Sequence, residues 1–172
     1  VENHDQQRIM RLAPSRSQAL AWTAFAAFNH GPLLIYAGQE AGATHTPSLF
    51  DVDKVEWGDL ALQPFLTTLA QLKKHAAQTT GKFVLTAAEP AIQAAWQSAS
   101  GNLFGLFNVM AATGDVAVPL PDGDYADLLG GGAVHVRDGR MALPAAAVIL
   151  AYAEALPLRP FFSPLLDFHL PA

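Results

Sequence analysis

Residues 101–143 read GNLFGLFNVMAATGDVAVPLPDGDYADLLGGGAVHVRDGRMAL, and this stretch decides the fold. Short apolar runs alternate in it with glycine, aspartate, asparagine and proline. The turn signals in and beside the stretch are Ser100-Gly101-Asn102, Thr113-Gly114-Asp115, Pro121-Asp122-Gly123 and Asp138-Gly139. Asp-Gly between two short apolar runs is a strong hairpin signal. Many short strands at this spacing predict an antiparallel β-sandwich.

The same texture extends outward from this stretch in both directions. The strands we expect are Lys82–Ala87, Ile92–Ser98, Leu103–Val109, Val116–Leu120, Tyr125–Leu129, Ala133–Arg137, Arg140–Leu143 and Ala145–Ala153. Gly130-Gly131-Gly132 is interpreted as a flexible turn rather than a phosphate loop, because no helix pattern follows it. We therefore place an all-β domain at 81–156 and a proline- and aromatic-rich tail at 157–172.

Residues 1–80 have a different, α/β texture. Pro14, Ser15 and Ser17 precede an apolar periodic run, which predicts a helix at Ser17–Asn29 with Trp22, Phe25 and Phe28 in the core. The continuous apolar run Pro32–Tyr36, bounded by Gly31 and Gly38, predicts a strand that is buried on both faces. Pro64–Gln78 predicts an amphipathic helix that Gly81 ends.

Composition limits the function classes. The chain has 172 residues, 51% of them hydrophobic and 15% charged, which is typical of globular protein with a face buried against something else. The net charge is −5 without a basic cluster, so we expect no nucleic-acid partner. No apolar run approaches the ~18 residues that span a bilayer, and we expect no membrane association. There is no cysteine, so disulfides and thiolate metal sites are excluded.

Two further expectations concern the context of the chain. It begins Val1-Glu2-Asn3-His4-Asp5 without an initiating methionine, so we expect it to be part of a longer protein. No signal peptide pattern is present. Localisation stays open between the cytoplasm and a bacterial-type secreted protein, and the absence of cysteine slightly favours the cytoplasm.

The segment Val1–Asp5, followed by Arg8, resembles the last signature region of the α-amylase family of glycoside hydrolases. Gly31–Gly42 resembles the eighth barrel strand of that family and the loop after it, and Ser48–Trp57 resembles the stretch before the last barrel helix. Phe107-Asn108 and the turn 121–125 resemble its C-terminal β-domain. The resemblance implies an α/β barrel fragment at 1–80, the last βα units of a TIM barrel, followed by an all-β antiparallel sandwich.

The resemblance also implies roles for three residues. Asp5 corresponds to the catalytic carboxylate that stabilises the transition state, and a negative charge suits a sugar that turns cationic during bond cleavage. His4 corresponds to a residue that hydrogen-bonds sugar hydroxyls. Arg8 belongs to the same substrate-binding set and is expected to fix a carboxylate by a bidentate pair. The implied substrate is an α-glucan or oligosaccharide whose α-glucosidic bond is cleaved with retention, by a glycosidase or a transglycosylase.

The nucleophile and general acid of the family are not matched in this sequence. Glu40, Asp51, Asp53 and Glu56 lie in or near the loop after the expected strand, but none sits in a motif that resembles either group. A retaining glycosidase needs both carboxyl groups. We therefore expect the parent protein to be the enzyme and this chain alone to be inactive, with the missing N-terminal barrel portion, or self-association, covering its open face.

Cofactors and metals are not expected in this chain. The family often binds calcium in the parent protein, but through ligands upstream of this stretch. Gln39 and Glu40 are interpreted as hydrogen-bonding residues of the barrel rim, and His45 as a solvated loop residue. Trp57 and Trp96 are interpreted as core residues rather than sugar platforms. The alternative function is a non-catalytic carbohydrate-binding or structural β-sandwich module.

Overall fold

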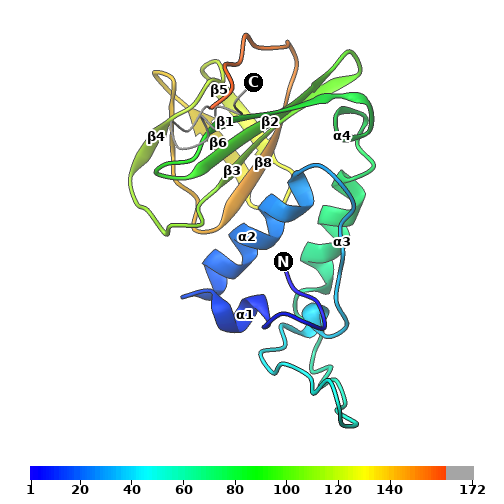
Figure 1. The fold of residues 1–172 in the computed structure, drawn as a ribbon. Coiled ribbons are helices and arrows are strands. Elements are labelled where there is room, and N and C mark those ends of the chain that lie inside the picture. Colours follow the sequence, from blue (N-terminus) through cyan, green and yellow to red (C-terminus); the bar gives the residue numbers. More distant parts are fainter. Residues whose placement is uncertain (162–172) are drawn as a thin grey trace, which may run out of the picture.

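A computed structural model describes residues 1–161 of the chain, in which helices lie beneath a β-sandwich (Figure 1). The helical elements are α1 (Ile9–Leu12), α2 (Arg16–Phe28), the 3₁₀ turn η1 (Gln39–Ala41), α3 (Gln63–Leu72) and α4 (Ala76–Thr80). The strands are β1 (Lys82–Ala87), β2 (Ile92–Ser98), β3 (Gly101–Phe107), β4 (Asp115–Ala117), β5 (Gly123–Asp127), β6 (Gly132–Val136), β7 (Arg140–Ala142) and β8 (Ala147–Tyr152). Each expected strand of the β-domain is confirmed, β1 and β2 with the predicted ends and the others with shifted ends.

The strands form a six-stranded sheet in the order β1-β2-β3-β8-β5-β6 and a two-stranded sheet of β4 and β7. All the pairs are antiparallel, and the register of β2 with β3 runs from Ile92 opposite Phe107 to Ser98 opposite Gly101. The prediction of an antiparallel, sandwich-like C-terminal domain is therefore confirmed.

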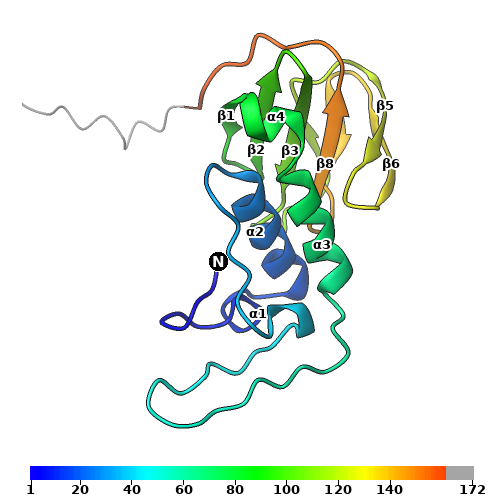
Figure 2. The same cartoon turned by 90° about the vertical axis from the view of Figure 1, so that its right-hand side faces the viewer.

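The central strands are buried on both faces. In β3, Leu103 and Phe107 face the cluster shared with the helices, whereas Phe104 and Leu106 face the cluster inside the sandwich. Figure 2 shows helices α2 and α3 lying below this sheet. Because successive side chains of a strand point to opposite faces, a doubly covered strand needs a continuous apolar run. This is why β3 and β8 have no alternation of polar and apolar residues.

The helix α2 begins as the sequence predicts. Ser15 is its N-cap, and the Ser15 Oγ accepts a hydrogen bond from the backbone N–H of Gln18 at 3.2 Å. The helix predicted at 64–78 is instead two helices. α3 ends at Leu72, and His75 caps the separate α4 by accepting from the N–H of Ala77 through Nδ1. This side-chain cap competes with continuation of the helix.

The strand predicted at 32–36 is not formed. The segment is extended but carries no ladder, and Leu34 is 58% exposed. A strand needs neighbouring backbone to accept and donate its hydrogen bonds, and none of the strands in residues 1–161 lies along this segment. The predicted barrel fragment is therefore not seen in residues 1–161.

The tryptophans divide between core and surface. Trp96 is buried, as predicted, and its Nε1–H donates to the carbonyl oxygen of Phe28 at 2.6 Å. The predictions for Trp22 and Trp57 were wrong, because these side chains are 39% and 49% exposed. Trp22 belongs to α2, an alanine-rich helix with apolar residues all round, and Trp57 belongs to the segment between η1 and α3. Figure 2 shows this segment extending from the body as a long loop.

Two further observations complete the fold. No helix among residues 1–161 is long and apolar enough to cross a membrane. The start of the tail lies beside β1, since the backbone N–H of Phe161 donates a hydrogen bond to the carbonyl of Leu85 at 2.7 Å. Leu156 and Leu158 pack against the inner cluster of the sandwich. The rest of the predicted tail, 162–172, lies outside the described residues.

Candidate functional site

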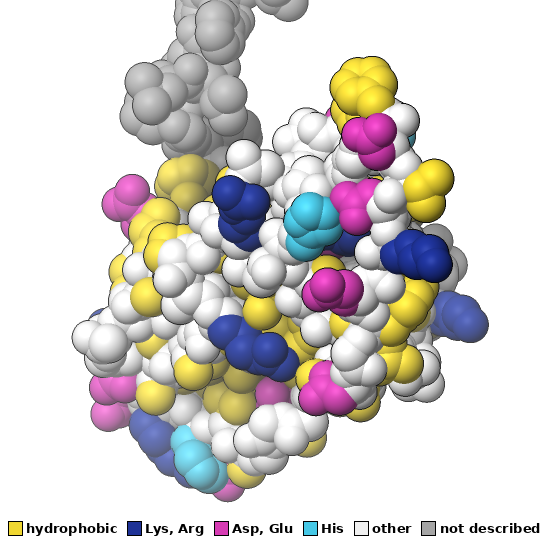
Figure 3. All heavy atoms as spheres, turned by 90° about the horizontal axis from the view of Figure 1, so that it is seen from below, with side chains coloured by type: hydrophobic (Ala, Val, Ile, Leu, Met, Phe, Trp, Pro, Cys, Tyr) yellow, Lys and Arg dark blue, Asp and Glu magenta, His cyan; other side chains and the backbone are white. Residues whose placement is uncertain are grey.

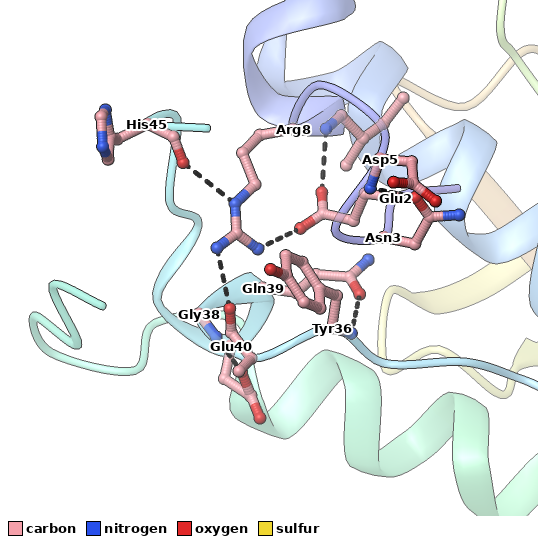
Figure 4. Close-up of polar contacts among 11 residues, drawn as sticks. Glu2, Asn3, Asp5, Arg8, Tyr36, Gly38, Gln39, Glu40 and His45 are labelled. Atoms are coloured by element: carbon pink, nitrogen blue, oxygen red, sulfur yellow. Dashed lines mark hydrogen bonds and ion pairs between the residues drawn. The ribbon is translucent and has the colours of Figure 1, made fainter. Parts of the chain in front are cut away.

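The predicted catalytic residue Asp5 lies in a tight turn that precedes α1. Its backbone N–H donates to Asn3 Oδ1 at 2.8 Å, and the N–H of Gln6 donates to the carbonyl of Asn3 at 3.3 Å. The side chain of Asp5 is 63% exposed and lies 3.2 Å from Nε2 of His4. The turn thus exposes the Asp5 carboxylate next to the His4 imidazole, which is 69% exposed. Figure 4 shows Asp5 with Asn3 in this turn.

The third predicted residue, Arg8, is buried directly behind this turn. Its Nη1 donates to Oε1 of Glu2 at 2.9 Å, and both side chains are 1% exposed. The other carboxylate oxygen of Glu2 accepts from the backbone N–H of Ile9 at 2.8 Å. Arg8 therefore holds a carboxylate, but the predicted bidentate geometry is not formed: one nitrogen contacts one oxygen, because the second oxygen of Glu2 accepts from Ile9. Its predicted contact with substrate stays a prediction.

Arg8 also reaches the segment that follows residue 35. Its Nε donates to the carbonyl of His45 at 3.1 Å, and its Nη2 donates to the carbonyl of Ala37 at 2.9 Å. The guanidinium lies 4.4 Å from the ring centre of Tyr36, a cation–π arrangement. Figure 4 shows the side chain of Arg8 bridging the N-terminal segment and this loop.

The loop approaches Arg8 through a glycine. Gly38 has a φ of 93°, and an added Cβ would lie 2.8 Å from Val55 and 3.3 Å from Nη2 of Arg8. A larger residue would meet both a strained backbone and a filled space. The neighbouring Gln39 is buried and accepts from the N–H of Tyr36, while Glu40 accepts from the N–H of Gly38. Both contacts agree with the structural role expected for these two residues.

A cavity of about 280 Å³ opens beside Arg8, between the segments 41–47 and 54–58. His45 lines it and pairs with Asp53 at 2.8 Å. This hydrogen bond and one from the backbone of Ser48 lower the pKa of Asp53 from its ordinary value. The face that carries this loop mixes acidic, basic, histidine and apolar side chains (Figure 3). Such a surface has no single-sign field that would attract a polyanion.

His45, Asp51 and Asp53, the acidic and histidine residues of the outer loop, do not form a cluster of metal ligands. Among residues 1–161, no group of three or more His, Asp and Glu side chains could hold a metal ion. The Glu40 carboxylate accepts a hydrogen bond from the backbone N–H of Gly38. The Asp53 carboxylate pairs with the imidazole of His45 and accepts from the backbone N–H of Ser48.

Sequence reasoning missed Glu2. The residue directly precedes Asn-His-Asp and stands six positions before Arg8, but no apolar periodicity or charge pattern marks it as buried. The spacing to Arg8 is the signal that could have indicated the pair. A glutamate this close to an arginine across a turn can close the base of that turn.

The fold and the order of elements can now be compared with those of known proteins. Residues 84–150 match the family model described as the bacterial alpha-amylase C-terminal domain. Comparison of the sequence with curated proteins gives no match.

Solved structures match most of the chain. An α-amylase from Lactobacillus plantarum is 29% identical with a TM-score of 0.75, and the match covers 88% of this chain and 37% of that one. The noncanonic maltogenic α-amylase AmyB from Thermotoga neapolitana has 18% identity and a TM-score of 0.71, with 90% and 40% covered. The α-amylase GTA from Geobacillus thermoleovorans, complexed with acarbose, has 17% identity and a TM-score of 0.67, with 90% and 38% covered.

These matches define the class of protein: the chain is similar over most of its length to α-amylase family glycoside hydrolases, and the resemblance inferred from the sequence is confirmed. Its segment 84–150 matches the family model of the bacterial alpha-amylase C-terminal domain. The chain spans about two fifths of the length of the solved structures it matches.

Proposed function

We propose that this chain is the C-terminal part of an α-amylase-type glycoside hydrolase that cleaves α-glucosidic bonds of starch, maltodextrin or related sugars with retention. The observation that carries the proposal is the likeness to the Lactobacillus plantarum α-amylase across 88% of the chain. The likeness extends well beyond the segment 84–150, into the helical half of the chain.

In this proposal, residues 1–80 complete a barrel whose other units lie elsewhere in the parent protein. The extended segment 32–36 is the eighth strand, and α3 is the helix that follows it. Leu34 and Ile35 are exposed here, which supports the idea that they face partners that this chain does not supply. A parallel barrel strand is covered on both sides, and its backbone pairs with its two neighbours.

Asp5 has the chemistry that the transition state requires. As a glycosidic bond breaks, positive charge develops on the anomeric carbon and the ring oxygen. A fixed carboxylate nearby stabilises that charge, and His4 beside it can donate to or accept from a sugar hydroxyl. The nucleophile and the general acid come from the missing barrel units, so this chain alone does not turn over substrate.

The test begins with the coding sequence upstream of Val1. We expect it to encode the earlier barrel units with two carboxylates in the positions of nucleophile and acid. The full-length protein should hydrolyse maltodextrin, and Asp5→Asn should lower kcat by about 10²-fold or more. Asp124→Asn, a change on the surface of the sandwich, is the matched control. An upstream sequence without a barrel, or full activity of Asp5→Asn, would contradict the proposal.

A second candidate function is that of a structural module. The sandwich shares one aromatic cluster with α2: Phe107 lies 5.4 Å from both Phe25 and Phe28, between ring centres. Trp96 is buried beneath it and cannot act as a sugar platform. This packing favours support of the helices over sugar binding by the β-domain. Calorimetry of the 172-residue chain with maltohexaose should show no binding to the sandwich, and affinity that survives Asp5→Ala and His4→Ala would favour a binding module.

A further inference from the structure

We propose that Glu2 is a positioning residue, which acts through Arg8 to hold the Asp5 turn against the loop 36–45. The inference rests on the proposed function, because it assigns Glu2 a part in placing the carboxylate that this function uses. It also makes a claim about the isolated chain that can be tested without any activity.

Glu2 fixes both ends of the turn that carries Asp5. Glu2 and Arg8 stand at the two ends of a short loop, and their ion pair of 2.9 Å closes its base. The same carboxylate accepts from the N–H of Ile9, the first residue of α1. Asp5 therefore lies at the tip of a loop whose two ends are fixed to each other and to a helix start.

The side chains of Glu2 and Arg8 are both buried. Taking a carboxylate and a guanidinium out of water is unfavourable, and their attraction offsets this only with good geometry and further hydrogen bonds. Here both oxygens of Glu2 and all three nitrogens of Arg8 are engaged. A buried pair of this kind is a poor source of stability compared with apolar packing, but it defines one arrangement of the groups around it.

Arg8 also links the Asp5 turn to the loop 36–45. Arg8 donates to the carbonyls of Ala37 and His45, which bracket η1, and its guanidinium packs on Tyr36. Gly38 leaves no room for a side chain at this contact. One side chain thus ties the turn that carries His4 and Asp5 to the loop after the proposed eighth strand.

The consequence for catalysis follows from geometry. A misplacement of about 1 Å by a change away from the chemistry can cost about 10²-fold in rate. Glu2→Gln keeps the shape of the side chain but removes the charge that holds Arg8. In the full-length protein it should lower kcat by about 10²-fold and change KM much less, because Glu2 itself is buried behind the turn and the pair orients Asp5.

The first arm of the test uses the 172-residue chain and hydrogen exchange. Glu2→Gln should accelerate exchange about tenfold or more at amides in both 3–9 and 37–45, since the loss of one buried charge leaves the other unpaired. The amides of β2 and β3 should keep the protection of the unchanged chain, which shows that the variant folds. Arg8→Lys, which keeps the charge but loses the planar fork, should give the same pattern more weakly. Asp124→Asn is the control and should change neither segment.

The second arm uses the full-length protein with maltodextrin. If Glu2→Gln loosens both loops and lowers kcat while KM stays close to its original value, the inference is supported. If exchange increases only in 3–9, or if both loops loosen and kcat is unchanged, the positioning role is overturned. If Asp5→Asn retains activity, the proposed function fails, whereas the exchange result still decides whether the two loops are coupled.

Discussion

The helical half and the β-sandwich of this molecule differ in how completely their backbone and apolar side chains find partners within residues 1–161. In the sandwich, every strand has a partner, and the central strands are covered on both faces. In the helical half, the segment 32–36 has no ladder, and the loop beyond it carries Phe50 at 93% exposure. Within residues 1–161, the strands of the sandwich thus pair with one another, whereas the segment 32–36 has exposed apolar side chains and no partner strand.

The largest expected effect tests where stability resides. Phe107→Ala should lower the free energy of unfolding by about 3–5 kcal/mol, because its ring is fully buried between α2 and the sheet. Phe50→Ala removes the same atoms from the exposed loop and should change stability by less than about 0.5 kcal/mol. Urea unfolding of both variants measures this. Equal losses would remove the distinction between the two halves.

A substitution at Gly81, where the helical half meets the β-sandwich, should have a smaller effect on stability. An added Cβ at Gly81 would contact the carbonyl of Ala77 and lie 2.8 Å from that of Gln97, and neither backbone group can move freely. Gly81→Ala should therefore cost about 1–3 kcal/mol. Gly123→Ala is the matched control, because its Cβ would make only an ordinary contact of 3.5 Å with Tyr125. Thermal melting of the two variants should separate them, and a stable Gly81→Ala would contradict the close approach.

Self-association is expected through the uncovered segment. The exposed Leu34 and Ile35 should drive the isolated chain to form dimers or larger species. Leu34→Lys should shift the sedimentation profile toward monomer, whereas Leu49→Lys, at an equally exposed position of the outer loop, should shift it less. A monomeric sedimentation profile of the unchanged chain would contradict the expectation that the exposed segment 32–36 drives association.

The smallest effect is a titration in the outer loop. Hydrogen bonds from His45 and from the Ser48 backbone lower the pKa of Asp53 below 3.8. A lowered folded-state pKa means that the contribution to stability is present above pH 3.8 and is lost as the pH falls through the folded value. His45→Gln should move the pKa of Asp53 back toward 3.8, as followed by NMR. Asp122, whose pKa is lowered by the backbone of Gly139 and Asp138, should titrate as before.

The strands of the sandwich could be predicted from the sequence because their signals are local. Turn residues such as Asp138-Gly139 mark the boundaries, and the continuous apolar runs of β3 and β8 indicate burial on both faces. The same kind of run at 32–36 predicted a strand that the structure does not form. A ladder depends on a partner strand, and that partner cannot be read from the run itself.

The candidate site was only partly accessible to sequence reasoning. Asp5, His4 and Arg8 were named as site residues by resemblance, and their roles stay predictions. Glu2 was missed, because a buried ion pair has no periodic signature and depends on how a short turn closes. The exposure of Trp57 was missed as well, because a single tryptophan in a loop gives no indication of the direction in which it points.

The most direct test of the central claim is a crystal structure of the full-length protein with a bound maltooligosaccharide or an inert analogue. We predict that the Asp5 carboxylate lies within about 3 Å of a hydroxyl of the sugar at the cleavage point, with His4 on the same sugar. A structure in which the sugar binds far from the turn 3–6, and Asp5 faces only solvent, would contradict the account.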